Sequence, residues 1–177
     1  MGKATNKTTS RMMSSCVGDL IFVRPTGPGD WMGSLVARAT DGPYCHVQIR
    51  ISHFEVIEAL GRGICRDTLA SEPDPADVAR VGGSLPLERM ATAMNWLLNQ
   101  VNDRYGVFDI VADALQLALP KALGSRTPFL VAPSSYDCSH LAATFISGTG
   151  YPLPLDLIAD LPRVSPNALA RALGVLK

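Results

Sequence analysis

Cys138 is the residue whose position in the sequence most favours covalent chemistry. It lies near the start of Tyr136–Ser147, YDCSHLAATFIS, which we predict to be a helix because its apolar side chains recur at the spacing of one helix face. These side chains are Cys138, Leu141, Ala142, Phe145 and Ile146. The free N–H groups and the positive dipole end of a first helical turn favour the thiolate, the nucleophilic form of cysteine. Cys138 is therefore a candidate nucleophile, although a buried cysteine is also commonly a small core residue.

A nucleophilic thiol needs a base that accepts its proton and later delivers it to the leaving group, and histidine most often fills this role. The sequence contains three histidines. His140 follows Cys138 by two residues, about 200° around the same helix, so we expect it to face away from the thiol. His53 falls in a predicted turn, where we expect it to hold the turn backbone. His46 remains, on the polar face of the predicted strand Cys45–Ile51, where a structural role is the alternative.

Glu58, in the next predicted strand Glu55–Leu60, is the candidate partner of His46. If the turn Ser52–Phe54 between the strands holds an odd number of residues, the register puts His46 and Glu58 on the same face as diagonal neighbours, about 7–8 Å apart along the backbone. A carboxylate there would hold one imidazole nitrogen and leave the other for the thiol. An even number would place the two on opposite faces, and Glu58 would be a solvated strand residue.

The remaining pattern indicates the elements that position these residues. Predicted strands are Val17–Arg24, Cys45–Ile51, Glu55–Leu60, Gly63–Arg66 and Val78–Val81. Predicted helices follow the cap residues Asp30 and Ser84, cover Phe108–Leu123 and Tyr136–Ser147, and close the chain after Ser165-Pro166. The helix after Asp30 has an apolar face made of Trp31, Leu35, Val36 and Ala39. Strands and helices are segregated rather than strictly alternating, which predicts an α+β fold with an antiparallel sheet packed against helices.

Length and charge limit the classes of protein to consider. The 177 residues predict a single domain over residues 16–177, preceded by an arm, residues 1–15, that is flexible or ordered by a protein partner. Basic and acidic residues number 16 each, which argues against binding to nucleic acid or to an anionic membrane. The arm lacks the apolar segment of a secretory signal. The apolar run Gly106–Leu123 is interrupted by charged residues, so we predict a buried helix and no transmembrane segment.

The four cysteines, at positions 16, 45, 65 and 138, form no CxxC pair and no compact framework. We therefore expect neither a zinc site nor a disulfide scaffold, and no metal or organic cofactor. Reduced thiols fit a cytoplasmic protein. A protein carried on a particle or released with one would also lack an export signal, so the compartment stays open.

Five segments resemble one known family in their order along the chain. They are GDLIFVR at 18–24, CHVQI at 45–49, VIEALGRGI at 56–64, YDCSHL at 136–141 and SPNALARAL at 165–173. They resemble the opening strand, histidine strand, following strand, nucleophile motif and closing helix of the circularly permuted papain-like amidases. This is the permuted branch of the NlpC-type cell-wall peptidases, which includes YiiX-like proteins and relatives of lecithin retinol acyltransferase. In the unpermuted relatives the cysteine precedes the histidine strand, whereas here only His140 follows Cys138.

The resemblance implies a permuted papain-like fold in which Cys138 is the nucleophile, His46 the general base and Glu58 the residue that orients His46. The backbone N–H of Cys138 would contribute to the oxyanion hole. Substrate-binding roles are implied for Tyr105, which resembles a tyrosine that shapes the substrate site, and for Gln48. Gln48 replaces a small residue on the face expected to meet substrate, so we expect a narrower or more polar pocket. An ordinary helix-end aromatic is the alternative for Tyr105.

The same resemblance implies a cysteine amidase or peptidase that acts through a thioester on peptide amides of peptidoglycan. A lipid acyl hydrolase or acyltransferase would use the same triad. The third alternative is a non-catalytic interaction module of a larger particle, such as a phage tail. The lack of a predicted membrane anchor or long apolar lid favours the peptide substrate.

Overall fold

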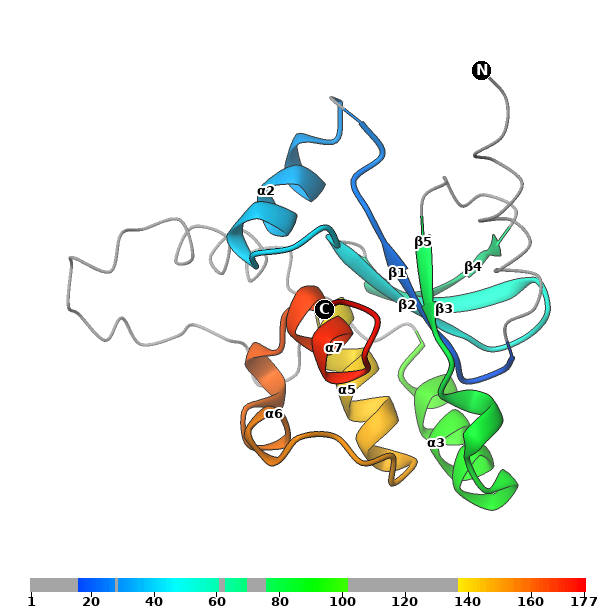
Figure 1. The fold of residues 1–177 in the computed structure, drawn as a ribbon. Coiled ribbons are helices and arrows are strands. Elements are labelled where there is room, and N and C mark those ends of the chain that lie inside the picture. The colour runs from blue at the N-terminus through cyan, green and yellow to red at the C-terminus, as the bar shows by residue number, and fades with distance from the viewer. Residues whose placement is uncertain (1–15, 28, 61–62, 70–75, 102–136) are drawn as a thin grey trace, which may run out of the picture.

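The computed structural model of the chain describes residues 16–27, 29–60, 63–69, 76–101 and 137–177 (Figure 1). Its strands are β1 (Leu20–Val23), β2 (His46–Arg50), β3 (Glu55–Leu60), β4 (Gly63–Thr68) and β5 (Ala76–Ala79). They form one sheet in the order β4-β3-β2-β1-β5, and every neighbouring pair is antiparallel. The helices are α2 (Trp31–Ala39), α3 (Leu87–Asn99), α5 (Cys138–Gly148), α6 (Leu155–Ala159) and α7 (Pro166–Ala172). The predicted α+β class with an antiparallel sheet packed against helices is confirmed.

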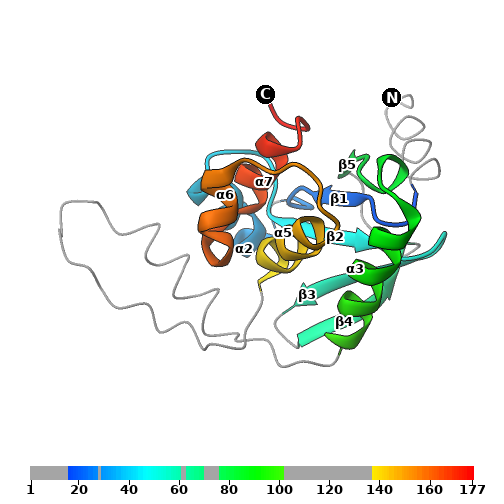
Figure 2. The same ribbon diagram turned by 90° about the horizontal axis from the view of Figure 1, so that it is seen from below.

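One face of the sheet packs against α3, α5 and α7 (Figure 2). The strands alternate, so every second side chain points into this layer. The sheet contributes Leu20, Phe22, Val47, Ile49 and Ile57, and the helices contribute Leu97, Leu141, Phe145 and Leu169, among other residues of the same buried cluster. The apolar stripe of α5 is thus part of the main core. A smaller cluster on the other face contains Ile21, Val23, Val56 and Ala76.

Two of the three predicted cap residues cap their helices. An Asp30 carboxylate oxygen accepts a hydrogen bond from the Gly33 N–H at 2.8 Å and begins α2. The Ser165 hydroxyl accepts from the Ala168 N–H at 3.2 Å, with proline at the first position of α7, where its missing N–H is not needed.

The prediction that Ser84 caps a helix is wrong. Ser84 ends a short 3-10 turn, Gly82–Ser84, and its hydroxyl donates to the carbonyl oxygen of Val81 at 2.8 Å. Helix α3 begins at Leu87, with Pro86 as its N-terminal flanking residue. Because a proline disfavours helical geometry in the residue before it, the helix cannot extend back to Ser84.

The fifth strand also differs from its predicted position. β5 begins two residues before the predicted Val78 and ends at Ala79. It pairs with β1 and therefore does not extend the β2–β3–β4 meander. The predicted helix Phe108–Leu123, Tyr105 and the arm at residues 1–15 lie outside the described residues.

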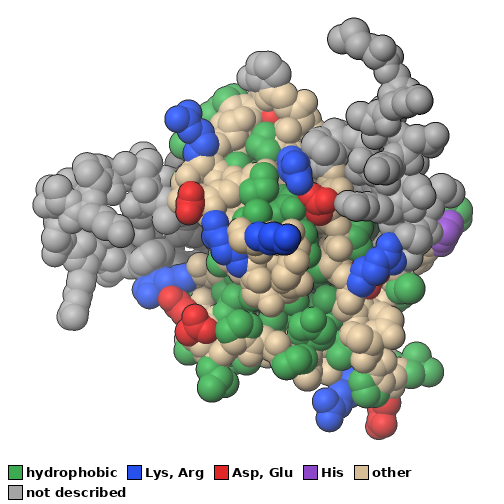
Figure 3. Space-filling view, in the orientation of Figure 1, with side chains coloured by type: hydrophobic (Ala, Val, Ile, Leu, Met, Phe, Trp, Pro, Cys, Tyr) green, Lys and Arg blue, Asp and Glu red, His purple; other side chains and the backbone are tan. Residues whose placement is uncertain are grey.

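Several large apolar side chains are exposed on the surface. On α2 only Ala37 is buried, and Trp31 is 67% exposed, although the helix has the predicted apolar face. Leu87 on α3 and Leu155 on α6 are also exposed. On the face drawn in Figure 3, hydrophobic side chains gather over the helices in the lower half, and charged side chains of both signs are interspersed. Within the part of the chain that the structure describes, no helix has the length and apolar character needed to span a membrane.

Candidate active site

The β2–β3 hairpin sets the relative position of His46 and Glu58. Gln48 lies directly opposite Glu58, and Ile49 opposite Ile57. The pairing continues to the turn, where the Ile51 N–H donates to the Glu55 carbonyl at 3.0 Å, so three residues, 52–54, form the loop. This is the odd count that the sequence required. His46 stands two residues before Gln48, so its side chain shares a face with Glu58 on the diagonal.

The His46 and Glu58 side chains form a close, largely buried pair. The distance between His46 Nε2 and Glu58 Oε2 is 2.7 Å, with side-chain exposures of 19% and 5%. The Gln48 amide also donates to Glu58 Oε2, at 3.0 Å. Gln48 itself is 2% exposed. Because a hydrogen bond to a carboxylate is stronger in a shielded environment, these contacts fix the orientation of the imidazole.

Cys138 begins α5 at the end of β2 that carries His46. The preceding residue, Asp137, caps the helix, and its carboxylate accepts from the His140 N–H at 2.6 Å. Helix α5 packs against β2 and β3. The Cys138 side chain is partly buried, and its charge and hydrogen bonding act on the His46 imidazole.

The protonation of His46 reflects both partners. Burial by itself lowers the pKa of this imidazole, but the charge and hydrogen bond of Cys138, followed by those of Glu58, raise the pKa to about 10. A histidine in this setting stays protonated at neutral pH, with Cys138 and Glu58 as the two groups that raise its pKa.

A second thiol lies beside this pair, and sequence reasoning did not assign it to the site. Burial raises the pKa of Cys45 to about 12, with smaller contributions from the charges of Asp30 and Cys138. The Cys45 thiol donates to the carbonyl oxygen of Val23 at 3.5 Å. Cys45, the residue directly before His46, therefore stays protonated at neutral pH. The signal in the sequence was only the adjacency of Cys45 to His46.

The other histidines occupy different positions. His53 lies in the hairpin turn, where its carbonyl oxygen accepts from Arg50 at 2.7 Å and its ring contacts Phe54 edge-on. His140 is half-buried on α5, and burial lowers its pKa. Tyr105, the other predicted substrate-binding residue besides Gln48, lies outside the described residues.

No protein-family model, curated protein or solved structure matches this chain.

Proposed function

We propose that this chain is a cysteine hydrolase of the amidase or peptidase type, with a permuted papain-like (NlpC-type) arrangement of Cys138, His46 and Glu58. The single observation that supports it is the His46 imidazole placed between two partners. Glu58 Oε2 lies 2.7 Å from His46 Nε2, and the charge and hydrogen bonding of Cys138 act on the same ring. The three residues come from three elements, β2, β3 and α5.

In the proposed reaction the Cys138 thiolate attacks the carbonyl carbon of an amide and forms a tetrahedral intermediate. The backbone N–H groups at the start of α5 donate to the oxyanion. The His46 imidazolium gives its proton to the departing amine, the C–N bond breaks and a thioester remains. Neutral His46 then takes a proton from water, which attacks the thioester. Cys138 is released as the thiolate and His46 is again protonated, so the ion pair is restored.

The proposed substrate class is the peptide amide of bacterial peptidoglycan, by family resemblance. One observation favours the second candidate, a lipid acyl hydrolase or acyltransferase. Helix α2 starts at Asp30, whose charge acts on Cys45 beside His46, and this helix exposes Trp31, Met32 and Leu35. An exposed apolar helix face near a thiol nucleophile fits an acyl chain.

The two candidates give different products. We would incubate the protein with purified peptidoglycan and, separately, with phospholipid vesicles, and measure new free amines and released fatty acid. The proposed function predicts new amines, lost in Cys138→Ala and His46→Asn and kept in Cys16→Ala, which removes an exposed thiol. Fatty acid release with the same variant pattern would establish the lipid enzyme instead. Equal product from wild type and Cys138→Ala would contradict both.

A further inference from the structure

Asn167 is a fully buried polar side chain that the proposed mechanism does not use. It is the second residue of α7, directly after the proline that follows the Ser165 cap, and its exposure is 0%. A buried amide is tolerated when its donors and acceptor find partners. The partners of Asn167 lie 123 or more residues earlier in the chain, in the segment that connects α2 to β2.

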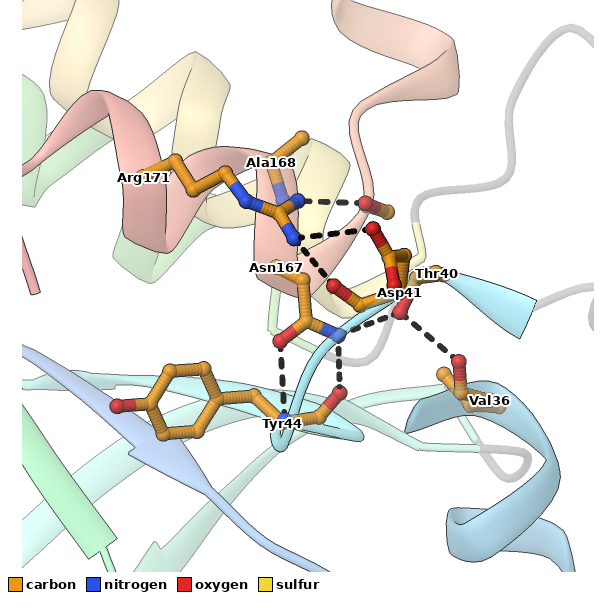
Figure 4. A network of polar contacts seen from close by, with 8 residues as sticks. Val36, Thr40, Asp41, Tyr44, Asn167, Ala168 and Arg171 are labelled. Atoms are coloured by element: carbon orange, nitrogen blue, oxygen red, sulfur yellow. Dashed lines mark hydrogen bonds and ion pairs between the residues drawn. The ribbon is translucent and has the colours of Figure 1, made fainter. Parts of the chain in front are cut away.

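The Asn167 amide holds both peptide groups of one residue, Tyr44 (Figure 4). Its Oδ1 accepts from the Tyr44 N–H at 3.0 Å, and its Nδ2 donates to the Tyr44 carbonyl at 2.9 Å. Nδ2 also donates to the Thr40 hydroxyl at 2.5 Å, and that hydroxyl donates to the Val36 carbonyl at 2.8 Å. Two opposed hydrogen bonds to one residue fix both the position and the direction of the backbone there.

Tyr44 is two residues before His46. Its side chain is anchored as well, because the hydroxyl donates to Asp77 Oδ2 at 2.9 Å on β5 and the ring lies 5.4 Å from that of Phe22 on β1. The next residue, Cys45, enters the sheet through a hydrogen bond to Val23 at 2.9 Å. The place where β2 begins, and hence where His46 stands, is therefore set from Tyr44.

The helix that holds Tyr44 also contacts the helix of the nucleophile. α7 packs against α5, which begins with Cys138, and Leu169 of α7 lies in the same core cluster as Leu141 of α5. The short helix α7 thus contacts both the helix that carries the thiol and the segment that leads into the strand of the imidazole. On its outer side Arg171 forms a hydrogen bond with the Asp41 carbonyl (Figure 4).

Asn167 also packs closely against Gly42, in the segment that connects α2 to β2. A Cβ added at Gly42 would overlap Asn167 Oδ1, so a larger residue at position 42 must displace the amide. The loop and the helix are thus fitted to each other at this point, and either side can be altered by substitution.

We propose that Asn167 is a positioning residue for the Cys138–His46 pair. This inference rests on the proposed function. By holding Tyr44 against α7, the Asn167 amide fixes the distance between the base at the start of β2 and the nucleophile at the start of α5. Displacing a catalytic pair by about 1 Å lowers reactivity by up to about 100-fold.

The test measures two properties of the Cys138–His46 pair and, separately, the free energy of unfolding of each variant. The readouts are the pKa of His46, from NMR titration of its imidazole Cε1–H, and the alkylation rate of Cys138 by iodoacetamide at about pH 6, where ordinary thiols are protonated. Asn167→Asp keeps the acceptor for Tyr44 N–H and loses both donors. Gly42→Ala pushes on the amide without altering α7. We expect both to lower the pKa of His46 by about one unit or more and to slow alkylation about tenfold or more.

Thr149→Val is the matched control, since Thr149 is 0% exposed and its hydroxyl donates to the Ile146 carbonyl at the far end of α5. We expect it to lower the free energy of unfolding and leave both readouts unchanged. If folded Asn167→Asp and Gly42→Ala match wild type in both readouts, or if Thr149→Val shifts them equally, the positioning role is wrong. If wild-type His46 shows an ordinary pKa and Cys138 reacts no faster than Cys16, the proposed function fails and this inference fails with it.

Discussion

Glu58 is the residue that gives the His46 imidazole its orientation and part of its charge preference. Its carboxylate is nearly buried and contacts both His46 and Gln48. These two contacts hold the Glu58 carboxylate in one position beside the imidazole, and its charge raises the pKa of His46. Glu58 therefore acts on the thiol only through His46, by stabilising its protonated form.

Replacing Glu58 by Gln should lower the pKa of His46 from about 10 toward the ordinary histidine range. The sign follows from the charge, because the carboxylate raises this pKa by favouring the protonated ring and an amide cannot. At pH 8–9 the variant should therefore hold more neutral imidazole than wild type. NMR titration of the three histidines measures this directly, and Glu55→Gln on the same strand is the control. An unchanged His46 midpoint in Glu58→Gln would contradict the assignment.

The sequence predicts the face of the sheet on which Gln48 lies, but not that its side chain is buried. Alternation along the strand puts Gln48 on the same face as His46, and this is what the register shows. We expected that face to meet substrate at Gln48, yet its side chain is 2% exposed and donates to Glu58. Alternation predicts which face a side chain shares, but what covers that face depends on segments far away in the sequence.

At the scale of the element, the start of α5 determines how the thiol is presented. Asp137 supplies the acceptor for the His140 N–H, so the first turn can form with Cys138 at its first position. The sequence predicted this helix from its apolar stripe. The predicted helix starts at Tyr136, so the prediction assigns no capping role to Asp137.

Asp137→Ala should lower the free energy of unfolding by about 1 kcal/mol, since the cap acceptor is lost. Asp137→Asn is the matched control, because asparagine caps as well as aspartate and its effect should be a few tenths of a kcal/mol. Urea unfolding measures both. Equal losses in the two variants would show that the carboxylate charge, rather than the cap, stabilises the first turn.

The hairpin was predictable because its information is local. Cys45–Ile51 alternates, and a three-residue turn before Glu55–Leu60 leaves one register that keeps Val47, Ile49 and Ile57 in the core. β5 was harder, since its partner β1 lies more than fifty residues earlier and its four residues carry little pattern. The short α6 was not predicted, because five residues cannot show a helical period.

At the scale of the whole molecule, one core joins the sheet to the helices that hold the site. Leu97 of α3, Phe145 of α5 and Leu169 of α7 are each 0% exposed within the same cluster. The site itself lies at the edge of this core, where α5 and β2 begin. Substitutions in the core should therefore change the free energy of unfolding, and substitutions at the site should change the reactivity of Cys138.

Leu97→Ala should lower the free energy of unfolding by about 2–5 kcal/mol, because it leaves a cavity in that core. Leu87→Ala on the same helix is the control, since Leu87 is 84% exposed and its loss should change stability by less than about 0.5 kcal/mol. Urea unfolding followed by circular dichroism measures both. A Leu97→Ala loss as small as that of Leu87→Ala would contradict the single core.

The central claim is that Cys138 is held as a nucleophile by His46, and the relative reactivity of the four free thiols tests it most directly. Each is alkylated by iodoacetamide at about pH 6 and its rate is followed by peptide mass spectrometry. We predict that Cys138 reacts at least about tenfold faster than the exposed Cys16, that Cys45 reacts slowest, and that His46→Asn removes the advantage of Cys138. A faster Cys16, together with no effect of His46→Asn on Cys138, would contradict the account.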